Sequence, residues 1–239
     1  MTEPQALVAL ISVCALTYSF EIIFGLAGTI MMLPILGFFF DSKTLVIYSL
    51  LPQLLVAGIA LTRSHQKLDL RLLWPMLALA ALGGLAGSYF FIQIPQEIFR
   101  RLLAATIIAA GIFLIIGPRF RLGPVTQRVL DFLAGVSHAL FGISGPIVMT
   151  RLLGSLEDKT MIRNSALFFF SGLNCVRAVY YLLHGSITAQ IQHMFVVSAI
   201  FLIPILMTAE RLHFKLNDLL FKKVVAWIIL FCGVVYMLR

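Results

Sequence analysis

The sequence predicts an all-α polytopic membrane protein with two inverted homologous repeats, each made of a glycine-broken helical hairpin and three transmembrane helices. Of the 239 residues, 61% are hydrophobic and only 12% are charged, whereas soluble domains carry roughly 25% charged residues. The phrase FGLAGTIMM at 24–32 recurs as FGISGPIVM at 141–149, each time inside an apolar segment. The composition indicates a membrane protein, and the recurring phrase indicates an internal repeat.

Apolar windows along the chain approach the ~20 residues that a helix needs to cross a hydrocarbon core of ~30 Å. They are Ala6–Phe24, Thr44–Leu61, Leu72–Ile92, Ile98–Ile116, Ala166–Leu183, Ile191–Ala209 and Leu219–Leu238. These spans leave no room for a soluble domain. The opening MTEPQ lacks the basic start of a signal peptide, so we expect the first span itself to act as the insertion signal.

The similarity between the two halves continues beyond the glycines. LGFFFDSKTLVIYS (Leu36–Ser49) corresponds to LGSLEDKTMIRNS (Leu153–Ser165). Further on, IPQEIFRRLLAATIIAAG (Ile94–Gly111) corresponds to LNDLLFKKVVAWIILFCG (Leu216–Gly233). We therefore predict one integral membrane domain with a first repeat at 1–120 and a second repeat at 121–239, joined by a loop rich in Pro, Gly and Arg.

The basic residues decide between two topologies for the glycine-broken segments. The net charge is +8, and the eighteen Lys and Arg lie in short loops rather than on one amphipathic face, so we expect no nucleic-acid partner. Such residues accumulate in short cytoplasmic loops. Hairpins place most of them in the cytoplasm, whereas single crossings divide them almost evenly. We therefore predict hairpins, with both termini outside and the loops at Arg63–Arg71 and Arg211–Lys223 inside.

The arm that follows each glycine turn is also short. Thr29–Phe40 and Pro146–Leu156 are each about half of the ~20 residues that a crossing requires. One hairpin enters from each face, so we expect the two turns to meet near the midplane, where irregular backbone must be buried in protein or line a wet cavity. Whether the hairpins are re-entrant or fully spanning is left open. Inverted repeats with interrupted helices at the midplane are typical of secondary transporters.

The helix starts after the two turns are the predicted binding site. Free N–H groups and the helix dipole make a helix N-terminus an anion site, and the hydroxyls of Thr29 and Ser144 add donors. The candidate substrate-binding residues are Gly25, Ala27, Gly28, Thr29, Gly142, Ser144, Gly145, Pro146, Asn174 and Arg177. The alternative is that the glycines only allow close helix packing.

Two ionisable residues occupy equivalent positions above the turns. Glu21 and His138 each lie four residues before the first glycine of their phrase. Ionisable groups inside a membrane are costly and usually functional, so both are candidates for proton coupling. The alternative is a buried hydrogen bond that only fixes the helical arms.

Other polar residues lie in the apolar span that follows each hairpin. Arg177 either neutralises an anion in the cavity or extends to the outer interface, because it lies seven residues before His184 at the end of its span. The candidate path-lining residues are Ser49, Gln53, Asn164 and Ser165. Any of these four can instead form a hydrogen bond between helices.

Together these segments resemble the TauE/SafE-type anion exporters, a family typified by prokaryotic sulfite and organosulfonate exporters. The resemblance rests on FGLAGTIMMLPIL, FGISGPIVMTRLL, the Lys-Thr…Ser stretch after each, ALGGLAGSYF (Ala81–Phe90) and two helix starts in which Phe precedes two basic residues. It covers nearly the whole chain. It implies a multi-pass inner-membrane exporter of a small anion such as sulfite, a sulfonate or a carboxylate, driven by an ion or proton gradient.

The chain departs from the family pattern in two places. Family members usually have a denser glycine cluster in each turn, whereas this chain has Ala27 and Ser144 between its paired glycines. PILMTAERLH (Pro204–His213) also lacks the glycines that its counterpart ALGGLAGSYF has. These departures concern the substrate more than the fold.

Other functional classes have less support. An anion-selective channel is the alternative, because symmetric hairpins that meet at the midplane also build pores. The sequence contains no nucleophile–base pair, Walker loop or His–Cys metal spacing, so we expect no enzyme, no cofactor and no metal site. The expected partners are a small anionic substrate and the lipid bilayer. Substrate identity, direction of transport, coupling ion and homo-oligomer formation are left open.

Overall fold

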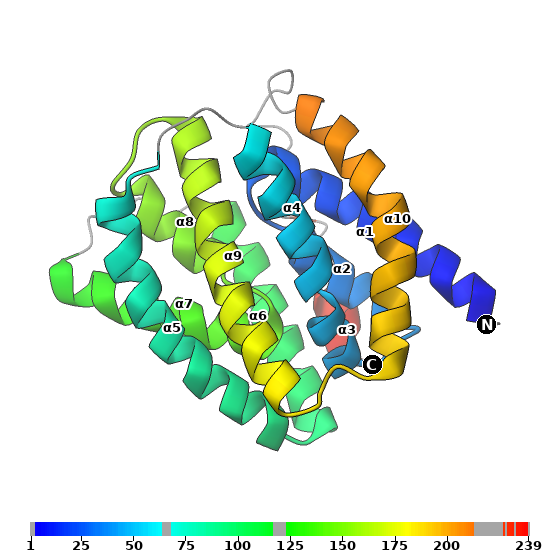
Figure 1. Ribbon diagram of the computed structural model, residues 1–239. Helices are drawn as coiled ribbons and strands as arrows, with labels where there is room; N and C mark the ends of the chain where they lie inside the picture. Colours follow the sequence, from blue (N-terminus) through cyan, green and yellow to red (C-terminus); the bar gives the residue numbers. More distant parts are fainter. Residues whose placement is uncertain are drawn as a thin grey trace.

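The described part of the chain is helical and contains no strand (Figure 1). The structure, a computed structural model, describes residues 3–63, 68–116, 123–212, 227, 229–231 and 233–238. The helices are α1 (Glu3–Phe24), α2 (Gly28–Leu36), α3 (Ser42–Tyr48), α4 (Leu50–Arg63), α5 (Leu70–Gln93), α6 (Gln96–Ile116), α7 (Pro124–Phe141), α8 (Gly145–Leu153), α9 (Lys159–Leu183) and α10 (Ala189–Leu212).

Within these residues, five helical stretches are long and apolar enough to cross a membrane. They are Gln5–Phe24, Ser42–Thr62, Leu70–Gln93, Thr160–Leu183 and Ala189–Arg211. The predicted all-α polytopic membrane fold is therefore confirmed. The predicted span Ile98–Ile116 forms as α6, and most of the predicted span Leu219–Leu238 lies outside the described residues.

Both recurring phrases form a turn between a long helix and a short one. Gly25 ends α1 with φ +79°, and Gly142 ends α7 with φ +68°. The N–H of each glycine donates to the carbonyl four residues earlier, over 2.7 Å to Glu21 and 2.8 Å to His138. A left-handed residue after a helix is a common C-cap, and glycine adopts it without a Cβ penalty. The helices that follow, α2 and α8, have nine residues each, as the short arms predict.

The aspartates after the hairpins begin the next helix in each half. The carboxylate of Asp41 accepts from the N–H of Thr44 over 3.0 Å at the start of α3, and that of Asp158 accepts from Met161 over 2.7 Å at the start of α9. Asp is among the strongest N-cap residues because it satisfies otherwise unpaired N–H groups. The Asp–Lys–Thr similarity between the halves therefore reflects a shared helix start.

The predicted span Thr44–Leu61 is divided into α3 and α4 near Ser49. Pro52 explains the division, because it has no N–H and its ring clashes with the carbonyl four residues before it. Near the break, the carbonyl of Val46 accepts from the hydroxyl of Ser49 and from the guanidinium of Arg177, each over 2.7 Å. The break therefore places a backbone acceptor inside the protein, where side chains satisfy it.

The long first helix of each hairpin packs on a helix of the other predicted repeat. α7 packs on α5, and α1 packs on α10. In the first pair the backbones are close: a Cβ on Gly83 would collide with the carbonyl oxygen of Phe132, and a Cβ on Gly135 would collide with that of Ala80. Small residues allow this approach between membrane helices. Glycines therefore hold the two halves together along α5 and α7.

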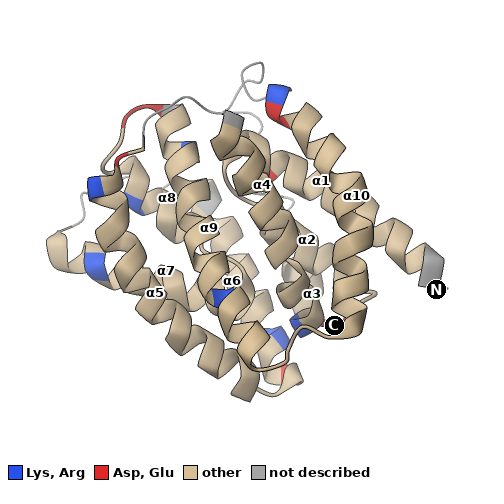
Figure 2. Ribbon diagram, in the orientation of Figure 1, with Lys and Arg blue, Asp and Glu red and all other residues tan. Residues whose placement is uncertain are grey.

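Corresponding helices of the two halves run in opposite directions. In Figure 1, α4 runs against α9, and α5 runs against α10. The end of α4 and the start of α9 lie at one end of the bundle, and the end of α9 lies at the other. Charged residues lie mainly near these ends, and the helix segments between the ends contain few charged residues (Figure 2). The inverted repeat and its sidedness in a membrane stay predictions.

Labelling of single cysteines at Thr62 and His184 tests the sidedness. Both residues are exposed, near the ends of α4 and α9. In a variant without native cysteines, we expect a membrane-impermeant maleimide to reach position 184 in intact cells and position 62 only after permeabilisation. Equal labelling of both positions in intact cells contradicts the inverted arrangement.

A pair of neighbouring glycines tests the packing of α5 on α7. We expect Gly83→Ala to lower the free energy of unfolding by about 1–3 kcal/mol, because the methyl group meets backbone that cannot move away freely. Gly84→Ala is the matched control, because its Cβ would lie 3.6 Å from Val176, an ordinary contact. Thermal unfolding in detergent measures both, and an equal effect of the two substitutions contradicts the packing argument.

Candidate functional site

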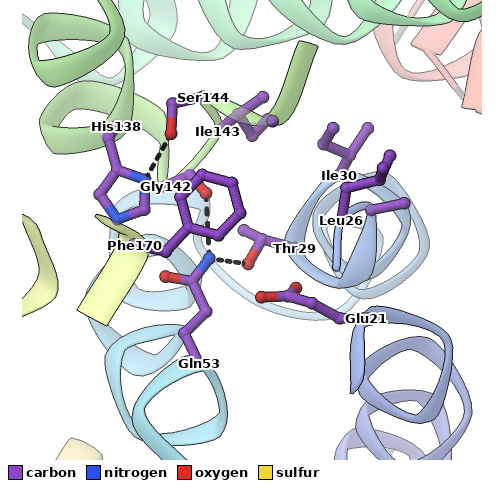
Figure 3. Close-up of a pocket in the computed structure, with 12 residues that line it drawn as sticks. Glu21, Leu26, Thr29, Ile30, Gln53, His138, Gly142, Ile143, Ser144 and Phe170 are labelled. Carbon is purple, nitrogen blue, oxygen red and sulfur yellow. Dashed lines mark hydrogen bonds between the residues drawn. The ribbon is translucent and has the colours of Figure 1, made fainter. Parts of the chain in front are cut away.

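The two glycine turns meet inside the protein. A Cβ on Gly142 would lie 3.1 Å from Cγ2 of Thr29, and a Cβ on Gly145 would lie 3.4 Å from Cβ of Leu26. Between the turns is a cavity with an empty volume of about 250 Å³ (Figure 3). It is lined by Glu21, Leu26, Ala27, Thr29, Ile30, Gln53, His138, Gly142, Ile143, Ser144, Gly145 and Phe170.

Half of the residues singled out in the sequence line this cavity. Those that do are Glu21, Ala27, Thr29, Gln53, His138, Gly142, Ser144 and Gly145. Those that do not are Gly25, Gly28, Ser49, Pro146, Asn164, Ser165, Asn174 and Arg177. The sequence interpretation missed the apolar lining of Leu26, Ile30, Ile143 and Phe170. An apolar residue in an apolar chain carries no signal that it faces a cavity.

The helix start after the first turn is occupied by Glu21. Its side chain is buried, and its carboxyl group accepts hydrogen bonds from the backbone N–H groups of Gly28 and Thr29. These are the first N–H groups of α2, which the sequence interpretation left free for a substrate anion. The chain therefore supplies its own carboxyl group to this helix N-terminus, and the expectation of two equivalent open termini is wrong.

The second turn has different chemistry at the equivalent position. His138 is buried, and its Nδ1 lies 3.0 Å from Oγ of Ser144, the residue before α8. Its ring stacks on Phe170, with centroids 5.7 Å apart and planes 8° from parallel. Ser144 makes no side-chain capping hydrogen bond to α8 within the described structure. The N-terminus of α8 thus faces the cavity without a carboxyl group of the kind that Glu21 provides to α2.

A hydrogen-bonded network joins the two turns. Gln53, from α4, donates through Nε2 to Oγ1 of Thr29 and to the carbonyl oxygen of Gly142 (Figure 3). Its Oε1 accepts from Nδ2 of Asn174 over 2.7 Å. Oδ1 of Asn174 in turn lies 3.1 Å from Nε2 of His138. Residues of both halves therefore form one buried polar network beside the cavity.

Arg177 belongs to this network and does not reach the surface. Its side chain is 0% exposed, donating to Oδ1 of Asn174 over 2.9 Å and to the carbonyl of Val46 over 2.7 Å. The interpretation that it extends to the outer interface is therefore wrong. The acceptor at Val46 explains its position, because the break between α3 and α4 offers a buried carbonyl to the guanidinium. Arg177 lies behind the cavity wall.

A second buried arginine, Arg163, was not predicted as a site residue. The sequence interpretation placed the Lys and Arg residues in short loops, but Arg163 is 2% exposed. Its Nε donates to the carbonyl of Ile22 in the last turn of α1 over 2.7 Å, and its NH2 lies 3.3 Å from Glu210 of α10. A cation near a helix C-terminus is favourable. In the sequence, this ion pair is indicated only by Glu210, an acidic residue directly after the predicted span Ile191–Ala209.

Ala27 is strained at the cavity wall. Among the described residues it is the one non-glycine residue with positive φ, at 86°. For an L-residue this left-handed conformation costs roughly 1–2 kcal/mol. Such strain concentrates at functional sites, and here it lies where the chain passes from α1 to α2.

A matched pair of substitutions tests the difference between the turns. In Gly28→Ala the new methyl group collides with the carboxyl group of Glu21, so we expect a loss of about 0.5–2 kcal/mol of stability, as for a lost helix cap. Gly145→Ala meets only Cβ of Leu26 at 3.4 Å and should be nearly neutral. Thermal unfolding of both variants in detergent measures the difference, and equal melting temperatures contradict the role given to Glu21.

Comparison with known proteins identifies a family. A match to the family described as Sulfite exporter TauE/SafE covers residues 10–236. No curated protein and no solved structure matches the chain. The family is one of membrane transporters, which implies a lipid bilayer around the helices and a small anionic substrate. Because the match spans nearly the whole chain, the protein belongs to the TauE/SafE sulfite exporter family.

Proposed function

We propose that the protein is a secondary transporter that exports a small anion across the inner membrane and binds it in the cavity between the glycine turns. The observation that carries this proposal is the meeting of two interrupted helices at one cavity that is lined by both polar and apolar residues. Interrupted helices at the interface of two repeats are where transporters bind substrates and coupling ions. Family membership supports a sulfite or sulfonate exporter, and a carboxylate is the other substrate class of the proposal.

The start of α8 is the proposed anion-binding end of the cavity. Its backbone dipole favours a negative charge, and Ser144 and Gly145 line the cavity at this point. Thr29 and Gln53 contribute polar groups from the first half. The cavity is small, which favours a compact anion over a large organic ligand.

The remaining predicted residues have supporting roles in this proposal. Gly25, Gly28 and Pro146 shape the two turns, and Asn174 and Arg177 hold the network behind the cavity wall. Ser49 packs at the second turn, because its Oγ would lie 3.0 Å from a Cβ on Gly142. Asn164 and Ser165 are buried in α9 and stay candidates for the substrate path.

Proton coupling follows from the position of Glu21 in this site. Its carboxyl group lines the same cavity as the start of α8. In a low-dielectric interior, an ionised carboxylate and a substrate anion repel each other strongly. Protonation of Glu21, or of His138 across the cavity, removes or offsets this repulsion. We therefore propose that anion binding is accompanied by proton binding at one of these two residues.

A carrier accounts for the cavity better than the alternative, an anion-selective channel. The hydrogen bonds from Gln53 to Thr29 and Gly142 cross from one turn to the other beside the cavity. A carrier must break such contacts and rebuild them during each cycle, which limits its rate. A channel needs a path that stays open while ions pass.

Transport by the purified protein in liposomes tests this proposal. We expect saturable counterflow of radiolabelled sulfite, competed by methanesulfonate or acetate according to the substrate class. Glu21→Gln or His138→Gln should stop proton-driven accumulation and keep counterflow, because glutamine retains hydrogen bonding but does not titrate. Glu157→Gln, at an exposed loop position, is the control. Linear, non-saturating flux favours the channel, and unchanged accumulation in both site variants contradicts the coupling role.

A further inference from the structure

The hydrogen bonds that join Arg177, Asn174, Gln53 and Gly142 beside the cavity all run in one direction from donor to acceptor. Arginine has only donors and a backbone carbonyl only accepts. Arg177 is the donor at one end, 2.9 Å from Oδ1 of Asn174, and the carbonyl of Gly142 is the acceptor at the other, 3.1 Å from Nε2 of Gln53. The two amides meet between these ends, from Nδ2 of Asn174 to Oε1 of Gln53. Turning either amide around would place two donors or two acceptors face to face, so both orientations are determined.

This direction determines the tautomer of His138. Its Nε2 lies 3.1 Å from Oδ1 of Asn174, the same oxygen that accepts from Arg177. Because that oxygen only accepts, Nε2 must carry the hydrogen. A neutral imidazole has one N–H, so Nδ1 is without hydrogen and accepts from the hydroxyl of Ser144, 3.0 Å away. The hydroxyl proton of Ser144 is then engaged, and its oxygen presents only lone pairs to the cavity.

Protonation of His138 reverses the direction of the hydrogen bond between its Nδ1 and Oγ of Ser144. Both ring nitrogens then donate, and Nδ1–H donates to Oγ of Ser144. The hydroxyl proton of Ser144 becomes free to point into the cavity that the residue lines. The oxygens of a sulfonate, a carboxylate or fully ionised sulfite accept hydrogen bonds and do not donate them, so only the second state offers such an anion a hydroxyl donor.

We propose that Ser144 is a proton-controlled anion ligand, whose hydroxyl becomes a donor to the bound anion when His138 is protonated. Arg177 and Asn174 are positioning residues that hold His138 in the tautomer that this switch requires. The inference rests on the proposed function, because it explains how a proton and an anion occupy the same site together. It assigns the coupling proton to the second turn and gives Ser144 a role that depends on pH.

Other charged groups bear on this protonation. Arg177 of α9 disfavours it through Asn174, whereas Glu21 of α1 lines the same cavity and favours it when ionised. On α7 itself, Asp131 lies two turns earlier and is 3.6 Å from Arg151 of α8. The charged residue of α5, Arg71, lies in its first turn. An anion in the cavity adds a negative charge and favours protonated His138.

The tautomer is tested first, without any anion. In ¹⁵N-histidine-labelled protein in nanodiscs, with the signal assigned by its loss in His138→Gln, we expect the chemical shifts of an Nε2–H tautomer at about pH 8. Asn174→Leu should produce a mixture of tautomers. Asn174→Asp should keep the Nε2–H form, because the carboxylate still accepts a hydrogen bond from Nε2. This variant replaces the leucine variant in the test if that variant does not fold. An Nδ1–H tautomer in the unmodified protein overturns the inference.

The ligand role of Ser144 is tested by binding of methanesulfonate, which stays ionised between about pH 4 and pH 8 and whose charge in the cavity favours protonated His138. We expect Ser144→Ala to leave the affinity unchanged at about pH 8 and to weaken it at least ~10-fold at about pH 4, where the hydroxyl donates to the anion. Thr29→Val is the control, because the hydrogen bonds of Thr29 go to Tyr18 and Gln53, and its effect should be the same at both pH values.

The outcomes separate this inference from the proposed function. An equal loss at both pH values, or no loss at either, overturns the switch while the transport proposal stands. If the unmodified protein binds neither methanesulfonate nor sulfite at either pH, the proposed anion site is contradicted. The tautomer measurement still decides the direction of the network in that case.

Discussion

The need to satisfy backbone polar groups inside a hydrocarbon layer governs this structure. Water is absent there, so each N–H or carbonyl freed by a helix break must find a partner within the protein. Among the described residues, such breaks lie between α1 and α2, between α3 and α4 and between α7 and α8, and buried polar side chains lie at each one. Glu21 binds the start of α2, Arg163 binds the end of α1, and Arg177 binds a carbonyl at the break between α3 and α4. Three of the buried charged residues described in this apolar chain, Glu21, Arg163 and Arg177, therefore lie where its helices are interrupted.

The two turns share a backbone geometry and differ in chemistry. Both end a long helix at a left-handed glycine and begin a nine-residue helix. Glu21 closes the first helix start with a carboxyl group, whereas His138 binds a serine hydroxyl and leaves the second start facing the cavity. The two similar segments thus share a backbone frame, and the difference between Glu21 and His138 leaves only the second helix start facing the cavity without a carboxyl partner.

The packing between the halves is also unequal. The glycines of α5 bring its backbone close to that of α7. The equivalent helix α10 lacks those glycines and carries Glu210, which pairs with Arg163. On one side of the molecule, α5 and α7 are therefore joined by close backbone contact. On the other side, Arg163 pairs with Glu210 of its own half and donates across to the carbonyl of Ile22 in α1. This difference accounts physically for the departure of PILMTAERLH from its glycine-rich counterpart, which in the sequence was only a missing pattern.

Local sequence features were enough to predict an all-helical membrane protein, the short arms after each turn, and the positions of Glu21 and His138 beside the breaks. These are local properties, because hydropathy, glycine position and capping residues act within a few turns of a helix. Only the tertiary structure decided the partners of Arg163 and Arg177, the occupation of α2 by Glu21, and the apolar lining that includes Phe170. Gln53 and Asn174, or Arg177 and Val46, are more than a hundred residues apart. Periodicity shows which face of a helix is buried, but it contains no information about which distant group that face meets.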